Sequence, residues 1–264
     1  MSNTWMDLAG KTVIVTGGNS GVGAHIVENL KANRANVVIC DLRPTAVADD
    51  GITFIQCDVT KRESVEAMVA KTIELFGKVD ALVNNAGVNR PRLLVDYYKK
   101  HKEYEFSDAD FDFIVNVNQK GPFLCAQAVA RNMIERKSGV IVNISSEAGS
   151  EGSAGQSVYA ATKGAVNAFT RSWAKELGKF NIRVVGIAPG INQRTEMNNE
   201  QNYKALAYTR GLDSDNIDND YTKIIPLGRV GNLDEIGDLV SYLVSDHSSY
   251  ISGTTINISG GKSR

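Results

Sequence analysis

KTVIVTGGNSGVG, residues 11–23, is the stretch that decides the fold. It begins with an apolar, β-branched run, which is typical of a strand buried on both faces of a parallel sheet. Glycines follow at once, and a helical pattern begins behind them. Such a turn lets a phosphate approach the backbone closely, and the helix N-terminus offers its free N–H groups. The spacing is Gly-x-x-x-Gly-x-Gly, so by itself a turn that binds nothing remains an alternative.

Six further apolar runs follow along the chain: ANVVIC (35–40), ITFIQC (52–57), KVDALVN (78–84), GVIVNIS (139–145), IRVVGIA (182–188) and TTINIS (254–259). Segments with helical periodicity separate them, such as the stripe of Val65, Met68 and Val69. Strands that alternate with helices indicate βαβ units. We therefore expect an α/β fold. Residues 1–264 would form one Rossmann-type domain, a doubly wound sheet of seven parallel strands with helices on both faces.

Two long connections interrupt this alternation, at residues 89–107 and 191–224. Each follows the carboxyl end of a predicted strand, the edge at which ligands bind in such sheets. Long connections in compact domains are usually functional lids, or else disordered. We expect both to form the substrate site. Together with the C-terminal tail they supply basic side chains, namely Arg90, Arg92, Arg194, Lys204, Arg210, Lys262 and Arg264.

The composition argues against several classes of function. The 264 residues carry 29 basic and 30 acidic side chains, which is not the basic excess of a nucleic-acid binder. No apolar run has the roughly 18–20 residues of a membrane span, and we expect no signal peptide. The three cysteines lie in apolar runs, which favours a reduced, cytoplasmic protein. His25, His101 and His247 lack metal-ligand spacing, so we expect no metal.

An acidic residue at the end of the second predicted strand favours a dinucleotide site. Asp41 lies 18 residues after Gly23, where a carboxylate binds the ribose hydroxyls of NAD. It would repel the 2′-phosphate of NADP, whereas the neighbouring Arg43 could accommodate that group. A solvated strand-end residue is the alternative interpretation of Asp41. We expect NAD, held by a turn that comprises Gly17, Asn19, Ser20, Gly21, Val22 and Gly23.

A tyrosine and a lysine one helical turn apart form the candidate catalytic pair. Tyr159 and Lys163 share one face of a predicted helix. A free tyrosine has a pKa of about 10, and a nearby ammonium lowers it. The phenol could then exchange a proton with a substrate oxygen at neutral pH. Such pairs also occur in ordinary helices, but Ser146 lies 13 residues before Tyr159, at the end of a predicted strand, and this favours catalysis.

With these residues in place, the sequence resembles the short-chain dehydrogenase/reductase family over essentially its whole length. The shared motifs are Thr16–Gly23, Asp58-Val59, Asn84–Gly87, Val117–Gly121, Ile144–Ser146, Tyr159-x-x-x-Lys163, Pro189-Gly190 and Gly260-Gly261. The resemblance implies a catalytic tetrad. Ser146 would bind the reacting oxygen, and Tyr159 would act as acid and base. Lys163 would lower the Tyr159 pKa and hold the nicotinamide ribose, and Asn118 would anchor a water in the proton relay.

The same resemblance implies further contacts to the cofactor. Asp58 and Val59 would flank the adenine. The segment Asn85, Ala86 and Gly87 would lie along the ribose. The segment Pro189, Gly190 and Ile191 would face the nicotinamide. Family members often have a threonine five positions after this proline, whereas here Arg194 stands there and Thr195 follows, so either residue could make that contact.

Several segments resemble more narrowly the bacterial dehydrogenases that interconvert sorbitol 6-phosphate and fructose 6-phosphate with NAD. These segments are residues 84–96, 118–133, 145–179, 205–211, 226–231 and 248–264. A phosphorylated polyol needs basic groups for its phosphate and polar groups for its hydroxyls. We expect Arg90 or Arg92 to contact the phosphate, although a solvated surface charge is the alternative for each. The hydroxyls would contact Glu147, Glu151, Gln156 and Asn192.

Two other functions remain open at this point. One is a reductase of another carbonyl, such as an unphosphorylated sugar, another polyol-derived ketone or a 3-oxoacyl thioester. The other is an NAD-binding regulator without chemistry, which the complete tetrad argues against. The family resemblance also implies a homotetramer, with the helices at about 108–135 and 157–178 at one interface and the C-terminal strand at another. We expect a small-molecule substrate and no nucleic-acid or membrane partner.

Overall fold

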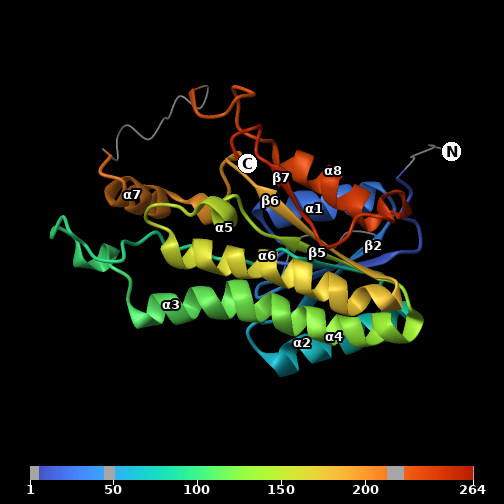
Figure 1. The fold of residues 1–264 in the computed structure, drawn as a ribbon. Coiled ribbons are helices and arrows are strands. Elements are labelled where there is room, and N and C mark those ends of the chain that lie inside the picture. The colour runs from blue at the N-terminus through green and yellow to red at the C-terminus, as the bar shows by residue number, and fades with distance from the viewer. Residues whose placement is uncertain (1–5, 45–50, 213–222, 264) are drawn as a thin grey trace.

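Seven parallel strands form the sheet at the centre of the molecule, in the order β3-β2-β1-β4-β5-β6-β7 (Figure 1). The computed structural model describes residues 6–44, 51–212 and 223–263. The strands are β1 (Thr12–Thr16), β2 (Asn36–Asp41), β3 (Ile52–Gln56), β4 (Ala81–Asn84), β5 (Gly139–Ile144), β6 (Ile182–Pro189) and β7 (Thr255–Ile258). The strand order reverses between β1 and β4. This reversal opens a crevice at the carboxyl ends of the strands, where ligands bind in such folds.

Helices connect most of the strands. They are α1 (Gly21–Ala32), α2 (Arg62–Phe76), α3 (Asp108–Val115), α4 (Gly121–Arg136), α5 (Ala148–Glu151), α6 (Ser157–Leu177), α7 (Glu200–Thr209) and α8 (Leu233–Val244). Asn116–Lys120 forms a π-helical turn between α3 and α4. Single 3₁₀ turns lie at Lys102–Tyr104, Gly178–Phe180, Glu196–Asn198 and Asp246–Ser248.

The helices cover both faces of the sheet (Figure 1). On one face, α1 and α8 pack against Val13 and Val15 of β1. On the other face, α2 and α4 pack against Ile14, and Trp173 of α6 adds to that core. Successive side chains of a strand point to opposite faces. Because both faces are covered, the strands carry continuous apolar runs instead of an alternating pattern.

The predicted fold class is confirmed. Each of the seven apolar runs corresponds to a strand, and no strand end differs from the predicted one by more than three residues. Cys40, Cys57 and Cys125 are buried free thiols, as their apolar surroundings predict. Within the described part of the chain, no helix combines the length and the apolar character of a membrane span.

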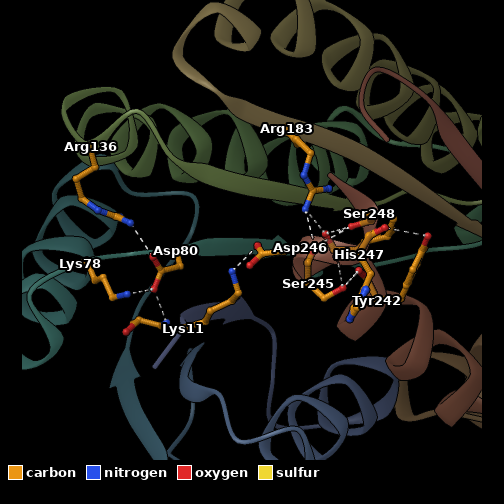
Figure 2. Close-up of polar contacts among 12 residues, drawn as sticks. Lys11, Lys78, Asp80, Arg136, Arg183, Tyr242, Ser245, Asp246, His247 and Ser248 are labelled. Carbon is orange, nitrogen blue, oxygen red and sulfur yellow. Dashed lines mark hydrogen bonds and ion pairs between the residues drawn. The ribbon is translucent and has the colours of Figure 1, made fainter. Parts of the chain in front are cut away.

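Charged groups stabilise the opposite edge of the sheet, at the amino ends of the strands (Figure 2). Asp80, which lies just before β4, accepts a hydrogen bond of 2.6 Å from Arg136 and pairs with Lys78 at 3.0 Å. Arg183 of β6 donates to the carbonyl oxygens of Leu243 and Ser245, at 2.7 and 3.1 Å, and so satisfies the C-terminal end of α8. These charges lie away from the ligand-binding edge and serve the fold.

A chain of polar side chains crosses the core from β4 to α6. Asn84 donates to the side-chain oxygen of Asn143, its register partner on β5, at 2.9 Å. Asn143 in turn donates to the hydroxyl of Thr170 on α6, also at 2.9 Å. All three side chains are buried, so water does not compete for these hydrogen bonds. The amide chain of Asn84, Asn143 and Thr170 therefore fixes α6 against the sheet.

Candidate active site

One large cleft opens at the carboxyl ends of the strands. Its volume is about 970 Å³, and it runs from the glycine turn after β1 to the residues around Ser146 and Tyr159. That volume lies at the upper end of the range of about 300–1,000 Å³ that small-molecule sites span. The cleft is thus a site of small-molecule size that joins the glycine turn to the region of Ser146 and Tyr159.

Two glycines of the turn, Gly17 and Gly23, have no space for a side chain. Gly17 has a φ of +65°, and a Cβ there would lie 2.9 Å from the backbone of Ala86. A Cβ on Gly23 would lie 2.0 Å from the carbonyl oxygen of Gly17. The hydroxyl of Thr16 accepts hydrogen bonds of 3.0 Å from the backbone N–H groups of Asn85 and Ala86. This close packing brings the start of α1 to the cleft floor, and the bare backbone suits a pyrophosphate at a helix N-terminus.

Asp41 ends β2 and lines the same cleft. Its carboxylate accepts the backbone N–H of Leu42 at 2.7 Å and that of Asn19 at 3.3 Å, which fixes its orientation. The side chain of Asn19 donates to the backbone carbonyl of Arg43. Arg43 is not among the cleft-lining residues, so a carboxylate and not a guanidinium faces the cleft at this end. The bare backbone of the glycine turn and the Asp41 carboxylate fit a nicotinamide dinucleotide.

Most of the other residues predicted to contact the cofactor also line the cleft. They are Gly17, Ser20, Gly21, Val22, Gly23, Asp58, Val59, Asn85, Ala86, Gly87, Pro189, Gly190 and Ile191. Asn19 does not line it: its backbone N–H donates to Asp41, and its side-chain nitrogen donates to the carbonyl of Arg43. Thr195 does line the cleft, and a Cβ on Gly21 would lie 3.2 Å from it. Arg194 instead lies over the ring of Tyr203, 5.0 Å from its centre.

Ser146, Tyr159 and Lys163 line the cleft together, as the sequence predicts. Lys163 donates to the carbonyl oxygen of Ile144 at 2.8 Å, and its ammonium lies 5.7 Å from the centre of the Tyr159 ring. Burial raises the pKa of Tyr159; a hydrogen bond with Ser146 opposes this shift, and the charge of Glu147 adds to it. Burial also lowers the pKa of Lys163 to about 8.

The net shift of the Tyr159 pKa is upward. The lowering by Lys163 that we expect from the sequence stays a prediction, since burial is the largest cause of the net shift. The reason for the upward shift is desolvation, which disfavours the phenolate as well as the nearby ammonium. The phenol of Tyr159 therefore keeps its proton at neutral pH.

Asn118 lies behind the cleft, in the π-helical turn between α3 and α4. Its side-chain oxygen accepts the backbone N–H of Val88 at 2.8 Å, and its nitrogen donates to the Val88 carbonyl at the same distance. A Cβ on Gly87 would lie 3.5 Å from the Asn118 oxygen and 3.6 Å from the Lys163 ammonium. Asn118 thus holds the segment after β4 in place, and Gly87 lies between it and Lys163.

The two arginines predicted for the substrate have different surroundings. Arg90 lines the cleft, pairs with Asp110 at 2.8 Å and lies 4.1 Å over the ring of Phe113. Arg92 does not line the cleft. It lies 3.8 Å from the other oxygen of Asp110 and over the ring of Tyr104, which makes it a support of the loop. The other predicted substrate residues all line the cleft: Glu147, Glu151, Gln156 and Asn192.

The predicted basic residues Arg210 and Lys262 line the substrate end of the cleft. Further residues line it that the sequence did not indicate individually: Asn89, Phe113, Met197, Asn199, Asn202, Tyr203, Leu206, Leu212 and Ile224. Most belong to the excursion at 191–224, whose length was the available signal. Arg264, also named as a basic candidate, lies outside the described residues.

The two excursions pack against each other at the side of the cleft. The hydroxyl of Tyr208 on α7 donates to Asp96 at 2.6 Å. The rings of Tyr98, His101 and Tyr104 surround Tyr208, with centres 4.9 to 5.3 Å from its own. The amide of Asn202 donates to the carbonyl of Asn89 at 3.4 Å. We call this group of Asp96, Tyr98, His101, Tyr104 and Tyr208 the lid cluster.

The C-terminal tail also reaches this cleft, which Lys262 lines. The ammonium of Lys262 lies 2.7 Å from one oxygen of Glu147 and 3.9 Å from an oxygen of Glu151. The hydroxyl of Ser263 donates to the other oxygen of Glu147. Glu147 directly follows Ser146, so the tail contacts a residue adjacent to the reacting centre.

A sequence model of one protein family, described as short chain dehydrogenase, matches residues 11–205. The chain belongs to the short-chain dehydrogenase family. Members of this family are oxidoreductases that use NAD or NADP, and this chain is such an enzyme.

Curated relatives and solved structures agree with this assignment. The sorbitol-6-phosphate 2-dehydrogenase of Klebsiella pneumoniae is 48% identical, over 99% of both chains. A 3-oxoacyl-[acyl-carrier-protein] reductase of Chlamydia muridarum is 37% identical, over 96% of this short-chain dehydrogenase and 98% of the relative. The crystal structure of levodione reductase superimposes with a TM-score of 0.85 at 31% identity, over 97% and 98% of the two chains.

Proposed function

We propose that the protein is an NAD-dependent dehydrogenase that interconverts sorbitol 6-phosphate and fructose 6-phosphate. The observation that carries the reaction class is the cluster of Ser146, Tyr159 and Lys163, which shares one cleft with the glycine turn. The observation that supports the substrate is the 48% identity with a sorbitol-6-phosphate 2-dehydrogenase, over 99% of both chains. All four members of the predicted tetrad are present, which argues against a regulator without chemistry.

In the proposed mechanism, Ser146 binds the ketone oxygen and Tyr159 donates its proton to that oxygen as the alcohol forms. Lys163 lies beside the phenol and stabilises negative charge on it when the proton leaves. Asn118 holds the segment after β4 and anchors the water that returns a proton to Tyr159. When bound, the nicotinamide cofactor supplies or accepts the hydride.

The chain's own residues would hold the cofactor. The backbone N–H groups at the start of α1 bind the pyrophosphate, and Asp41 binds the ribose hydroxyls. The sequence left open whether Arg194 or Thr195 contacts the cofactor. We assign this contact to Thr195, which packs against Gly21. Because Asp41 faces the cleft and Arg43 does not, the site favours NAD over NADP, whose 2′-phosphate a carboxylate repels.

At the substrate end, we assign the phosphate to the basic residues that line the cleft from the two excursions, Arg90 and Arg210. Arginine binds phosphate in a bidentate, charge-assisted geometry. Glu147, Glu151, Gln156 and Asn192 would bind the hydroxyls of the polyol. Together these groups suit a substrate that carries both an anion and several hydroxyls.

A second candidate function is the reduction of a 3-oxoacyl thioester. The relative from Chlamydia muridarum supports it, as do the apolar side chains of Met197, Leu206 and Ile224 in the cleft. The cationic groups at the same end favour the phosphorylated sugar.

The test is NADH oxidation by the purified protein with fructose 6-phosphate, run beside fructose, beside acetoacetyl coenzyme A and beside NADPH. We expect turnover with NADH and the phosphorylated sugar only. Turnover with the thioester would support the second candidate, and equal efficiency with NADPH would contradict the role given to Asp41.

Arg90→Ala and Arg92→Ala form a matched pair for the phosphate site. Both arginines lie in one loop beside Asp110, but only Arg90 lines the cleft. We expect Arg90→Ala to raise the KM for fructose 6-phosphate by about tenfold, since hydrogen bonds to charged groups contribute roughly 1.5–3 kcal/mol. Arg92→Ala should change it less. Equal effects would contradict the assignment of Arg90.

We also propose that the chain forms one domain and assembles as a homotetramer. Phe111 of α3 and Phe123 of α4 are exposed large side chains on the helices assigned to one interface. β7 lies at the edge of the sheet, beside the fully exposed Tyr250, on the surface assigned to the other interface.

A further inference from the structure

The C-terminal tail holds the side chain of Glu147 in a defined position. Both carboxylate oxygens of Glu147 have a donor from the tail, one from Lys262 and one from Ser263. The side chains of Glu147 and Lys262 are only 14% and 24% exposed. The Glu147 backbone is fixed as well, because its N–H donates to the carbonyl of Pro189 at 3.0 Å. A Cβ on Gly190 would lie 3.0 Å from the carboxylate, so the side chain has little freedom.

The charges around Lys262 argue against a role as phosphate ligand. Two carboxylates, those of Glu147 and Glu151, lie within 3.9 Å of its ammonium. A phosphate at this position would face both of them, and like charges at such distances repel strongly when they are partly desolvated. A neutral hydroxyl is a better neighbour, because it can donate a hydrogen bond to a carboxylate that Lys262 already neutralises.

We propose that Lys262 and Ser263 belong to the active site as positioning residues: they hold the Glu147 carboxylate next to Ser146, where it accepts a hydrogen bond from a hydroxyl of the polyol. This inference rests on the proposed function for the identity of the polyol, and on the geometry alone for the position of Glu147. It makes the tail a determinant of substrate specificity. Without Lys262, Glu147 would stand as an uncompensated charge beside the proton donor.

The charged and polar groups around Tyr159 and Glu147 determine how the pKa of Tyr159 should change in the variants. Ser146 and Glu147, from the segment after β5, and Lys163, from α6 itself, lie around Tyr159. Lys262, Ser263 and Glu151 act on Glu147. Removal of the Lys262 charge leaves Glu147 to disfavour the phenolate more strongly, which raises the pKa of Tyr159. Removal of the Glu147 charge has the opposite effect and lowers the pKa of Tyr159.

The experiment compares Lys262→Met, Lys262→Arg, Glu147→Gln and the double variant Glu147→Gln with Lys262→Met. The first measurement is the ultraviolet titration of the Tyr159 phenolate, obtained by difference from Tyr159→Phe in each background. We expect the midpoint to rise in Lys262→Met and to fall in Glu147→Gln. In the double variant it should stay at the Glu147→Gln value, because Lys262 acts through the Glu147 carboxylate. Lys262→Arg, which keeps the charge, should leave it close to the wild type.

The second measurement is steady-state kinetics with fructose 6-phosphate and NADH. We expect Lys262→Met to raise the KM by about tenfold. Without Lys262, the Glu147 carboxylate no longer lies in the correct position to accept the hydrogen bond from the substrate. In the Glu147→Gln background the same substitution should have little further effect, because both act through one carboxylate. Lys262→Arg should rescue most of the loss.

The outcomes separate this inference from the proposed function. An unchanged Tyr159 midpoint in Lys262→Met, or additive KM effects in the double variant, would show that the tail only packs against the cleft, and would overturn the inference. If the wild-type protein does not reduce fructose 6-phosphate, the proposed substrate fails, while the phenolate titration still decides whether Lys262 acts through Glu147.

Discussion

Tyr159 keeps its proton through the neutral pH range, because burial raises the pKa of its phenol above the ordinary value of about 10. A protonated phenol can give a proton to a ketone oxygen, which is the proton transfer that reduction requires. The reverse reaction needs the phenolate, and its population increases as the pH rises. Lys163 behaves differently: its pKa of about 8 means that it loses its positive charge just above neutral pH.

These directions predict a pH dependence. Reduction of the ketone should be nearly constant through neutral pH and fall above about pH 8, where Lys163 becomes neutral. Oxidation of the alcohol should rise with pH over the same range. Initial rates in both directions, measured at saturating substrate, check this. A reduction rate that stays constant well above pH 8 would mean that the charge of Lys163 is not needed.

Replacement of Tyr159 by Phe removes the proton donor and keeps the ring. We expect kcat to fall by at least roughly 10²–10⁴-fold, the usual contribution of a general acid. NADH affinity, followed by fluorescence, should change little because the ring still fills its place. Substantial residual turnover would assign proton transfer to another group.

Single residues show where sequence reasoning succeeds and where it fails. The spacing of Ser146, Tyr159 and Lys163 was enough to predict their meeting in one cleft, because a strand end and one helix face fix their positions. The direction of the Tyr159 shift could not be predicted, since it depends on burial by neighbours far away in the sequence. The contact of Lys262 with Glu147 joins residues 115 positions apart, and no local pattern indicates it.

At the scale of elements, the two excursions form one unit through the lid cluster. Asp96 and Tyr208 are 112 residues apart in the chain, yet their hydrogen bond of 2.6 Å joins the loop after β4 to α7. The sequence predicted both excursions as parts of the substrate site but not their contact with each other. The π-helical turn at Asn116–Lys120 was also not predicted, because a change in backbone hydrogen bonding has no signature in composition.

The lid cluster predicts a specific effect on substrate binding. Tyr208→Phe removes the hydrogen bond to Asp96, and we expect the KM for the sugar to rise about threefold to tenfold, from a bond of roughly 1 kcal/mol. The kcat and the NADH affinity should stay nearly unchanged, since neither Tyr208 nor Asp96 lines the cleft. Tyr242→Phe on α8, on another side of the molecule, is the control.

A double-variant cycle with Asp96→Asn refines this test. If the two residues act through one hydrogen bond, the combined substitution should cost less than the sum of the single ones. Fully additive effects would mean that the two excursions bind substrate independently.

For the molecule as a whole, the sequence predicted the architecture well because both faces of the sheet are covered. Each strand then needs a continuous apolar run and each helix an apolar stripe, and these patterns are visible without a structure. The same logic places the cleft, since all strands run parallel and their carboxyl ends meet at one edge. The path of the two excursions could not be predicted, because their sequences have no hydrophobic periodicity.

Assembly is the prediction at this scale. We expect light scattering to give a particle of about four times the chain mass of 28.6 kDa. Phe123→Glu, which places a charge on the exposed face of α4, should shift the particle toward a smaller size. A monomeric wild-type protein at micromolar concentration would contradict the proposed tetramer.

The amide chain of Asn84, Asn143 and Thr170 has a consequence for how mutations in this protein are interpreted. Thr170 lies on α6, the helix that also carries Tyr159 and Lys163. The hydrogen bonds of these three polar residues therefore fix the position of α6 along the sheet. A deep mutational scan selected on turnover would therefore mark Asn143 as intolerant, although it does not line the cleft. In such a scan, the map of sensitive positions would extend into the interior of the protein, along the polar residues that hold the catalytic helix in place.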